Sequence, residues 1–276
     1  MELCVTLEDL RPGTILLAPT GISTPYESVT GLQASGAQVQ SVLREAQLDL
    51  SAVCLRTESS KVELIWAFMG SAKGTDYPER AFTPMLNRYT RPDLALADQS
   101  QAIARKAGGG LAGIKALVAE TEAQFFYAHP NLRFTDDRDT VPLLSCGLTP
   151  GACVDINTYL IASLRAAGYD AGYIYGYFFP SGSANTTYDQ HCWVITRCDG
   201  EILEWDIAHH LKAGLGASQP GLNPHPGRRV ALGYAMGQQY TFNGTIIHTR
   251  LLAEPHRINT TTGEAERIGL TAEWRD

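Results

Sequence analysis

The chain has 276 residues, of which 44% are hydrophobic and 18% are charged, and its formal net charge at pH 7 is −7. This composition excludes an intrinsically disordered chain, and the acidic balance argues against a nucleic-acid partner, which would need a basic surface. The N-terminus lacks the pattern of a signal peptide, and no stretch reaches the apolar length of a membrane span. We therefore expect a cytoplasmic protein that has no membrane partner and whose six cysteines are free thiols.

The first eighty residues predict a small β-rich unit. Two runs of β-forming residues, at 13–17 and 62–69, are closed by the strand-breaking residues Pro19 and Gly70. Residues 28–50 fit either strands or a short helix. The turn-rich segment 71–80 predicts a linker. We expect an N-terminal unit of unknown role at 1–80 and a second domain at 81–276.

Two helices are predicted after residue 93. Residues 95–107 are rich in alanine, and three glycines follow them. Between residues 114 and 125 the apolar residues recur at helical spacing and predict a stripe that packs in the core: Ile114, Leu117, Val118, Thr121 and Phe125. The acidic loop that follows, residues 130–139, is interpreted as a connector rather than a lid.

A third helix is predicted at 151–167. Thr149 suits the capping position and Pro150 suits the first turn. Gly168 fits the left-handed residue that ends many helices. One face of this helix is apolar and contains Ile156, Leu160, Leu164 and Ala167.

Three strands are predicted next. Residues 171–179 alternate and place aromatic side chains on one face, which we interpret as core. Residues 191–198 and 201–206 flank Asp199-Gly200, a strong hairpin signal. A helix followed by antiparallel strands predicts an α+β fold in which the helix packs on the sheet.

Cys153 lies in the first turn of the predicted third helix. The unpaired N–H groups and the positive dipole end of a helix stabilise an anion there, which favours the nucleophilic thiolate. Gly151 has no side chain and leaves room for a substrate beside the sulfur. The backbone N–H of Cys153 can help to hold an oxyanion. Taken alone, this residue also fits a buried, inert cysteine.

His191 and Asp206 supply the other two groups that a thiol nucleophile needs. His191 opens a predicted strand, and the hairpin returns Asp206 to the same end of the sheet. An imidazole there can take the thiol proton and later protonate a leaving amine. A carboxylate can fix the imidazole tautomer and stabilise the imidazolium. Each residue alone is a weak signal, but the three in this order predict a catalytic triad.

Several segments around these residues resemble the transglutaminase-like superfamily, in particular its bacterial cysteine enzymes with a papain-like triad. The similarity extends over about residues 82–206 and is closest in Gly151-Ala152-Cys153-Val154-Asp155, in residues 160–168 and 171–177, in His191-Cys192-Trp193-Val194 and in Glu204-Trp205-Asp206. The resemblance implies a transglutaminase- or papain-like core and assigns the nucleophile to Cys153, the base to His191 and the orienting acid to Asp206.

The activity that the resemblance implies is acyl transfer through a thioester on the enzyme. With water as acceptor the chain is an amidase or peptidase, and with an amine it forms an amide bond. The substrates expected as partners are peptides, amines or thioesters, including thioesters attached to carrier proteins. Where bacterial members often have proline after the aspartate, this chain has Ile207-Ala208-His209-His210. No acidic cluster resembles the calcium sites of animal transglutaminases, so protein crosslinking of their kind is not implied.

Three other interpretations of the sequence compete with the triad enzyme, and each has a feature that counts against it. A catalytically silent binding or scaffold module of the same fold would be expected to lack triad residues, but all three are present. An arylamine acetyltransferase is expected to carry Arg-Gly-Gly-x-Cys, whereas Leu-Thr-Pro-Gly-Ala precedes Cys153. His209 and His210 match no familiar ligand spacing, and no dinucleotide fingerprint appears, so we expect neither a metal nor a cofactor.

Overall fold

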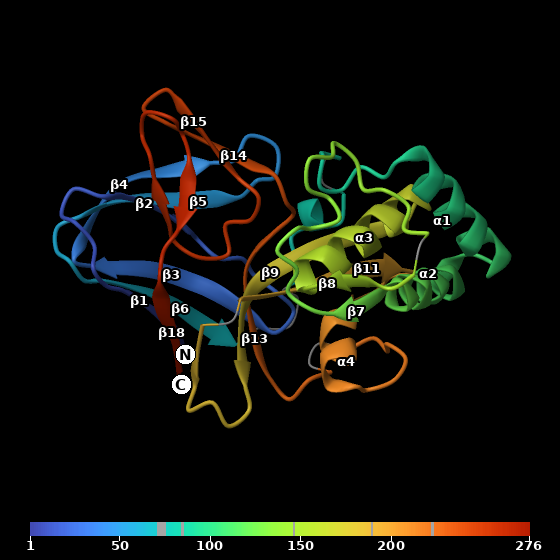
Figure 1. The fold of residues 1–276 in the computed structure, drawn as a ribbon. Coiled ribbons are helices and arrows are strands. Elements are labelled where there is room, and N and C mark those ends of the chain that lie inside the picture. Colours follow the sequence, from blue (N-terminus) through green and yellow to red (C-terminus); the bar gives the residue numbers. More distant parts are fainter. Residues whose placement is uncertain (71–75, 84–85, 146, 189, 222–223) are drawn as a thin grey trace. The chain divides into compact units, whose positions relative to one another are not determined.

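The computed structural model describes residues 1–70, 76–83, 86–145, 147–188, 190–221 and 224–276 (Figure 1). The chain divides into two compact units. Unit 1 contains Met1–Arg80, Tyr175–His191 and Gly227–Asp276, and unit 2 contains Ala81–Ile174 and Cys192–Pro226. Part of the predicted linker, residues 71–75, lies outside the described residues.

Unit 1 is built from two five-stranded sheets whose neighbouring strands are antiparallel. The first has the order β10 (Thr186–Thr187), β18 (Leu270–Arg275), β1 (Glu2–Leu7), β6 (Val62–Gly70) and β3 (Glu27–Ser35). The second has the order β17 (Ala265–Arg267), β16 (His256–Ile258), β2 (Ile15–Pro19), β5 (Ser51–Thr57) and β4 (Ala37–Arg44). The β-rich character predicted for the N-terminal region is confirmed.

The core of unit 1 is formed by apolar side chains from both sheets. In β6 buried and half-buried residues alternate, as expected for a strand with one face in the core. Leu64 and Trp66 of this strand are in one buried cluster with Leu16 of β2 and Leu55 of β5. The indole N–H of Trp66 donates to the carbonyl oxygen of Pro19 at 2.9 Å. These contacts join the two sheets of the unit.

Residues 28–50, which fit either strands or a helix, contain the strands β3 and β4. Gly36 turns the chain between them with a positive φ of 73°. A Cβ atom at this position would lie 2.2 Å from the carbonyl oxygen of Lys61, so the tight turn requires glycine.

The later parts of unit 1 add β13 (Gly227–Tyr234) and a hairpin of β14 (Gln238–Phe242) and β15 (Thr245–Thr249). Strand β9 (Asp170–Pro180) begins in unit 2 and ends in unit 1. Its second half lies against β13, since a Cβ atom at Gly176 would meet the carbonyl oxygen of Val230. The aromatic face predicted for this strand is buried and consists of Tyr173, Tyr175, Tyr177 and Phe179.

Unit 2 contains the helices. After a 3-10 turn at Glu79–Ala81 come α1 (Leu94–Lys106), α2 (Gly110–Gln124), α3 (Cys153–Ala166) and α4 (Ile207–Ala213). Asp93 caps α1 by accepting the N–H of Leu96 at 2.7 Å. The first three helices pack against one another, and α4 packs against α3. In the described part of the chain, no helix is long and apolar enough to cross a membrane.

The start of α3 differs from the sequence prediction. Thr149 and Pro150 do not begin the helix but lie in β8 (Thr149–Gly151), which pairs in parallel with β7 (Phe125–Tyr127). Ala152 is the capping residue and offers no side-chain acceptor. Instead, the Asp155 carboxylate, in the first turn of α3, accepts a hydrogen bond from the backbone N–H of Ala152 at 3.0 Å.

The predicted hairpin is confirmed. Strand β11 (Gln190–Cys198) pairs antiparallel with β12 (Glu201–Trp205), and Val194 lies opposite Trp205. Asp199 and Gly200 both have positive φ, as the tight turn requires. Together with α3, this hairpin confirms the α+β class. All five cysteines in the described residues are free, and Cys146 lies outside them.

Candidate active site

Cys153 is the first residue of α3 and is partly exposed. Its sulfur therefore lies where the unpaired N–H groups of the helix favour negative charge. Gly151 has a packing role, because a Cβ atom there would lie 2.7 Å from the ring of Phe125. The absence of a side chain at Gly151 thus lets β8 lie close to Phe125 of β7.

Arg133 is a member of this site that the sequence interpretation missed. Its Nη1 lies 2.7 Å from Oδ2 of Asp155, whose side chain is fully buried. Burial lowers the pKa of the guanidinium, but Asp155 and, more weakly, Tyr173 and Cys153 raise it, and the net shift is upward. Because Asp155 lies in the first turn of α3, the cation lies at the turn that Cys153 begins, and it neutralises the carboxylate there.

Cys192 is a second neighbour of the nucleophile. Burial raises the pKa of its thiol well above the ordinary value, and a hydrogen bond to Cys153 raises it further. Both effects favour the protonated form of the Cys192 thiol. Asn157 of α3 donates to the carbonyl oxygen of Cys192 at 2.9 Å and to its sulfur at 3.4 Å. The start of α3 is therefore fastened to the first part of β11.

His191 directly precedes Cys192 in β11 and is buried. Its ring lies against that of Phe178, with centroids 5.9 Å apart. A bond between His191 and the other two triad residues stays a prediction. What the structure shows is that Cys192, the next residue along the strand, is bonded to Asn157 of α3.

Asp206 follows β12 and caps α4. Because Val194 lies opposite Trp205, Asp206 leaves the hairpin at the end away from its turn, which is the end where Cys192 lies. One carboxylate oxygen accepts the backbone N–H of His209 at 3.0 Å, and the other lies 3.1 Å from Nδ1 of the same residue. The side chains of Asp206 and His209 are 1% and 4% exposed.

The segment that directly follows Asp206 is helical. Residues Ile207–Ala213 form helix α4, and Gly214 ends it in the left-handed conformation. The helix buries His209 and His210, and the ring of His209 lies 5.2 Å from that of His225. The capping aspartate at 206 was a possible signal for this helix. A carboxylate and an imidazole are also ligand types for Zn²⁺, so the Asp206–His209 pair is where a metal would be sought.

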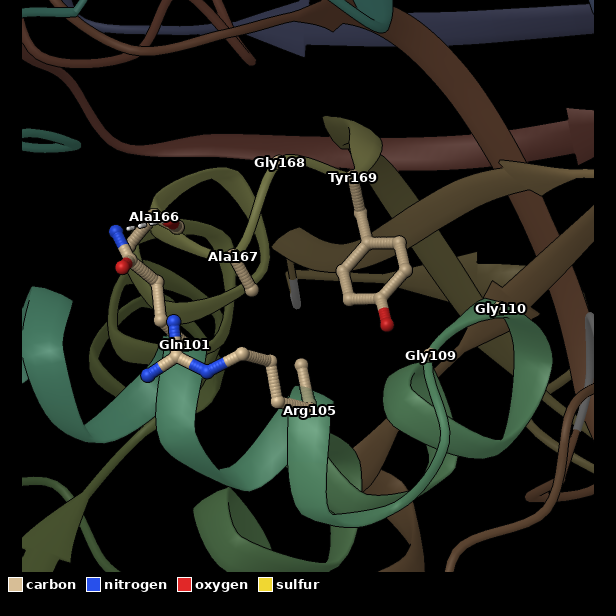
Figure 2. A pocket seen from close by; sticks show the side chains of 9 residues that line it. Gln101, Arg105, Gly109, Gly110, Ala166, Ala167, Gly168 and Tyr169 are labelled. Carbon is tan, nitrogen blue, oxygen red and sulfur yellow. Dashed lines mark hydrogen bonds between the residues drawn. The ribbon is translucent and has the colours of Figure 1, made fainter.

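A cavity of about 480 Å³ lies at the other end of α3, where Ala166–Gly168 meet Arg105 of α1 and the start of α2 (Figure 2). Tyr169 closes one side of it. Helix α3 has 14 residues, so its two ends are about 20 Å apart. This cavity is therefore remote from Cys153.

Comparison with known proteins supports the family interpretation. Residues 97–202 match the family model of the transglutaminase-like superfamily, which confirms the resemblance seen in the sequence. The match includes Cys153 and His191 and ends before Asp206. No curated protein sequence matches the chain.

Three solved structures are similar at low sequence identity. A candidate cysteine protease from Cytophaga hutchinsonii is 10% identical with a TM-score of 0.46, covering 99% of this chain and 96% of that one. The periplasmic domain of TgpA from Pseudomonas aeruginosa bound to ethylmercury is 14% identical with a TM-score of 0.37, covering 78% and 92%. A second structure of this domain is 12% identical with a TM-score of 0.35, covering 79% and 93%.

Proposed function

We propose that this chain is a cysteine-dependent acyl-transfer enzyme that works through a thioester on Cys153. The observation that carries the proposal is the surroundings of the sulfur. Cys153 begins α3, the cation of Arg133 pairs at 2.7 Å with Asp155 in the same turn, and Asn157 one turn later holds the thiol of Cys192 at 3.4 Å. A helix N-terminus, a cation and a hydrogen-bond donor all stabilise a thiolate over a thiol.

In the proposed mechanism His191 takes the thiol proton, and the thiolate of Cys153 attacks the acyl carbon of an amide or thioester. The carbon–sulfur bond forms as the carbonyl π electrons move to oxygen. Backbone N–H groups at the start of α3 support that oxyanion. When the oxyanion collapses, the bond to the leaving amine or thiol breaks, and His191 returns the proton to that group.

The second half of the reaction decides the product. His191 removes a proton from water or from an amine, and this nucleophile attacks the thioester and releases Cys153. Water gives a carboxylic acid, and an amine gives a new amide. Asp206 orients His191 and stabilises its charged form. Peptides, amines and thioesters, including thioesters on carrier proteins, are the proposed substrates, and no metal or organic cofactor takes part.

A silent scaffold of the same fold is the competing proposal. Its usual sign is the loss of triad residues, and Cys153, His191 and Asp206 are all present in this chain.

The test is intact-mass analysis of the protein after mixing with panels of peptides and thioesters. We expect an acyl adduct that peptide mapping places on Cys153 and that Cys153→Ala abolishes. Cys198→Ala, at the far end of β11, is the matched control and should leave the adduct unchanged. If no acyl donor in either panel modifies Cys153, or if the adduct maps to another cysteine, the proposed function is wrong.

A further inference from the structure

We infer that His209 is a positioning residue of the proposed active site, which holds the Asp206 carboxylate in one orientation through a backbone hydrogen bond to one oxygen and a contact of its ring Nδ1 with the other. The inference rests on the proposed function, because an oriented Asp206 matters only if it acts on His191. It assigns to His209 a role that the matched family span does not reach, since that span ends at residue 202.

The first step of the argument is the geometry of the pair. A capping aspartate needs only one carboxylate oxygen to accept the backbone N–H three residues later. Here His209 provides that N–H at 3.0 Å and also places its ring Nδ1 3.1 Å from the second oxygen. With one contact on each oxygen, the carboxylate cannot rotate about its Cβ–Cγ bond without losing one of them.

The second step is the number of acceptor positions. Each carboxylate oxygen offers two lone pairs, and His209 uses one on each oxygen. His209 therefore does not by itself use up either oxygen, and its contacts do not compete with the bond to a second imidazole that the proposed mechanism requires of Asp206.

The third step is burial. A carboxylate that is 1% exposed needs compensating donors, because an unpaired buried charge is costly. The ring of His209 is itself buried and lies 5.2 Å, between ring centres, from the ring of His225. Both side chains of the pair are therefore enclosed by protein.

The experiment compares two substitutions at His209. His209→Asn keeps an N–H donor at the position of Nδ1, whereas His209→Leu removes it at similar volume. The readout is the rate at which iodoacetamide alkylates Cys153 at pH 7, which follows the thiolate fraction and needs no substrate. We expect His209→Leu to slow alkylation about tenfold, as loss of an orienting partner often does, and His209→Asn to restore the rate to within about threefold.

The matched control is His210→Leu, the same change at the next residue of α4. His210 is also buried, but its side chain bonds to the backbone N–H of Gln219. A purely structural role for His209 predicts equal effects of the two leucine variants and no rescue by asparagine. Either result overturns the inference. If His209→Leu does not fold, a ¹⁵N-histidine spectrum decides: the Nδ1–H signal of His209 must shift in Asp206→Asn, and an unchanged signal also overturns it.

The two proposals fail in different ways. If Asp206→Asn and His191→Ala slow the alkylation of Cys153 but His209→Leu does not, the proposed function stands and the role of His209 is wrong. If none of the three changes the rate, the active site itself is wrong.

Discussion

Arg133→Gln tests the electrostatics at the start of α3. The substitution removes a cation 2.7 Å from Asp155 and leaves that carboxylate buried with the N–H of Ala152 as a remaining donor. Breaking a buried ion pair from one side costs about 3–5 kcal/mol. Because the Arg133 side chain is 32% exposed, water weakens the pair, and we expect about 2–3 kcal/mol of lost stability.

Calorimetry of the full chain measures this loss as a fall in Tm of about 5–10 °C. The double variant Arg133→Gln/Asp155→Asn removes both charges, so it should be more stable than Arg133→Gln alone. The resulting double-mutant cycle should give a coupling of at least about 1 kcal/mol. The same loss of the cation should slow the alkylation of Cys153. An Arg133→Gln protein with unchanged Tm and unchanged alkylation would refute the assignment of Arg133 to this site.

Four further predictions concern the thiols, the triad, metals and pH. Iodoacetamide should label Cys153 before Cys4, because burial raises the pKa of Cys4 to about 11 and leaves only about one thiolate in 10⁴ at pH 7. Asp206→Asn should lower turnover about 10³–10⁴-fold without unfolding the protein. Activity should survive EDTA under reducing conditions. Burial, together with the charge of Arg267, lowers the pKa of His256 to about 4 in the folded protein. Between pH 4 and 6.5 this histidine is therefore protonated in the unfolded protein but neutral in the folded one. Stability should therefore fall as pH drops through this range, by up to about 3 kcal/mol, and His256→Gln should remove that loss.

Each of these outcomes can fail in a specific way. Earlier labelling of Cys4 would contradict the activated thiol, and near-full activity of Asp206→Asn would remove that residue from the mechanism. Activity that EDTA abolishes and only added zinc or calcium restores would promote Asp206 and His209 to metal ligands. The pH measurement needs Glu27→Gln as a background, because burial raises the pKa of Glu27 to about 7. That carboxyl stabilises the fold below pH 4.5 and loses this effect as pH rises through 7, which opposes the His256 effect.

The parts of the fold that could be predicted are those determined by residues close together in the sequence. The stripe of α2 is buried as its helical spacing indicated, and Asp199-Gly200 turns between β11 and β12 because both residues have positive φ. The position of Cys153 in the first turn was also predictable, even though the cap was assigned to Thr149. The cap was misplaced because the backbone N–H of Ala152 is bonded by Asp155, a residue inside the helix, and not by a residue that precedes the helix.

The missed features depend on contacts between residues distant in the chain. Arg133 lies in a stretch with no periodic pattern, and only its ion pair with Asp155, 22 residues later, shows its role. Helix α4 is 7 residues long, too short for a clear periodic signal. Residues 227–276 group with 1–80 through strand pairs such as that of β18 with β1, which join the two ends of the sequence. No local propensity encodes such pairing.

The burial of α3 has a consequence for engineering. Ten successive residues, Asp155–Leu164, are buried, so this helix has no solvent-facing side along most of its length. Saturation mutagenesis should find almost no tolerated polar replacement there, whereas the half-buried Val154 beside Cys153 is open to variation. A library meant to change which acyl group the protein accepts should therefore leave the buried helix and Arg133 intact and randomise the exposed residues Asn131 and Leu132.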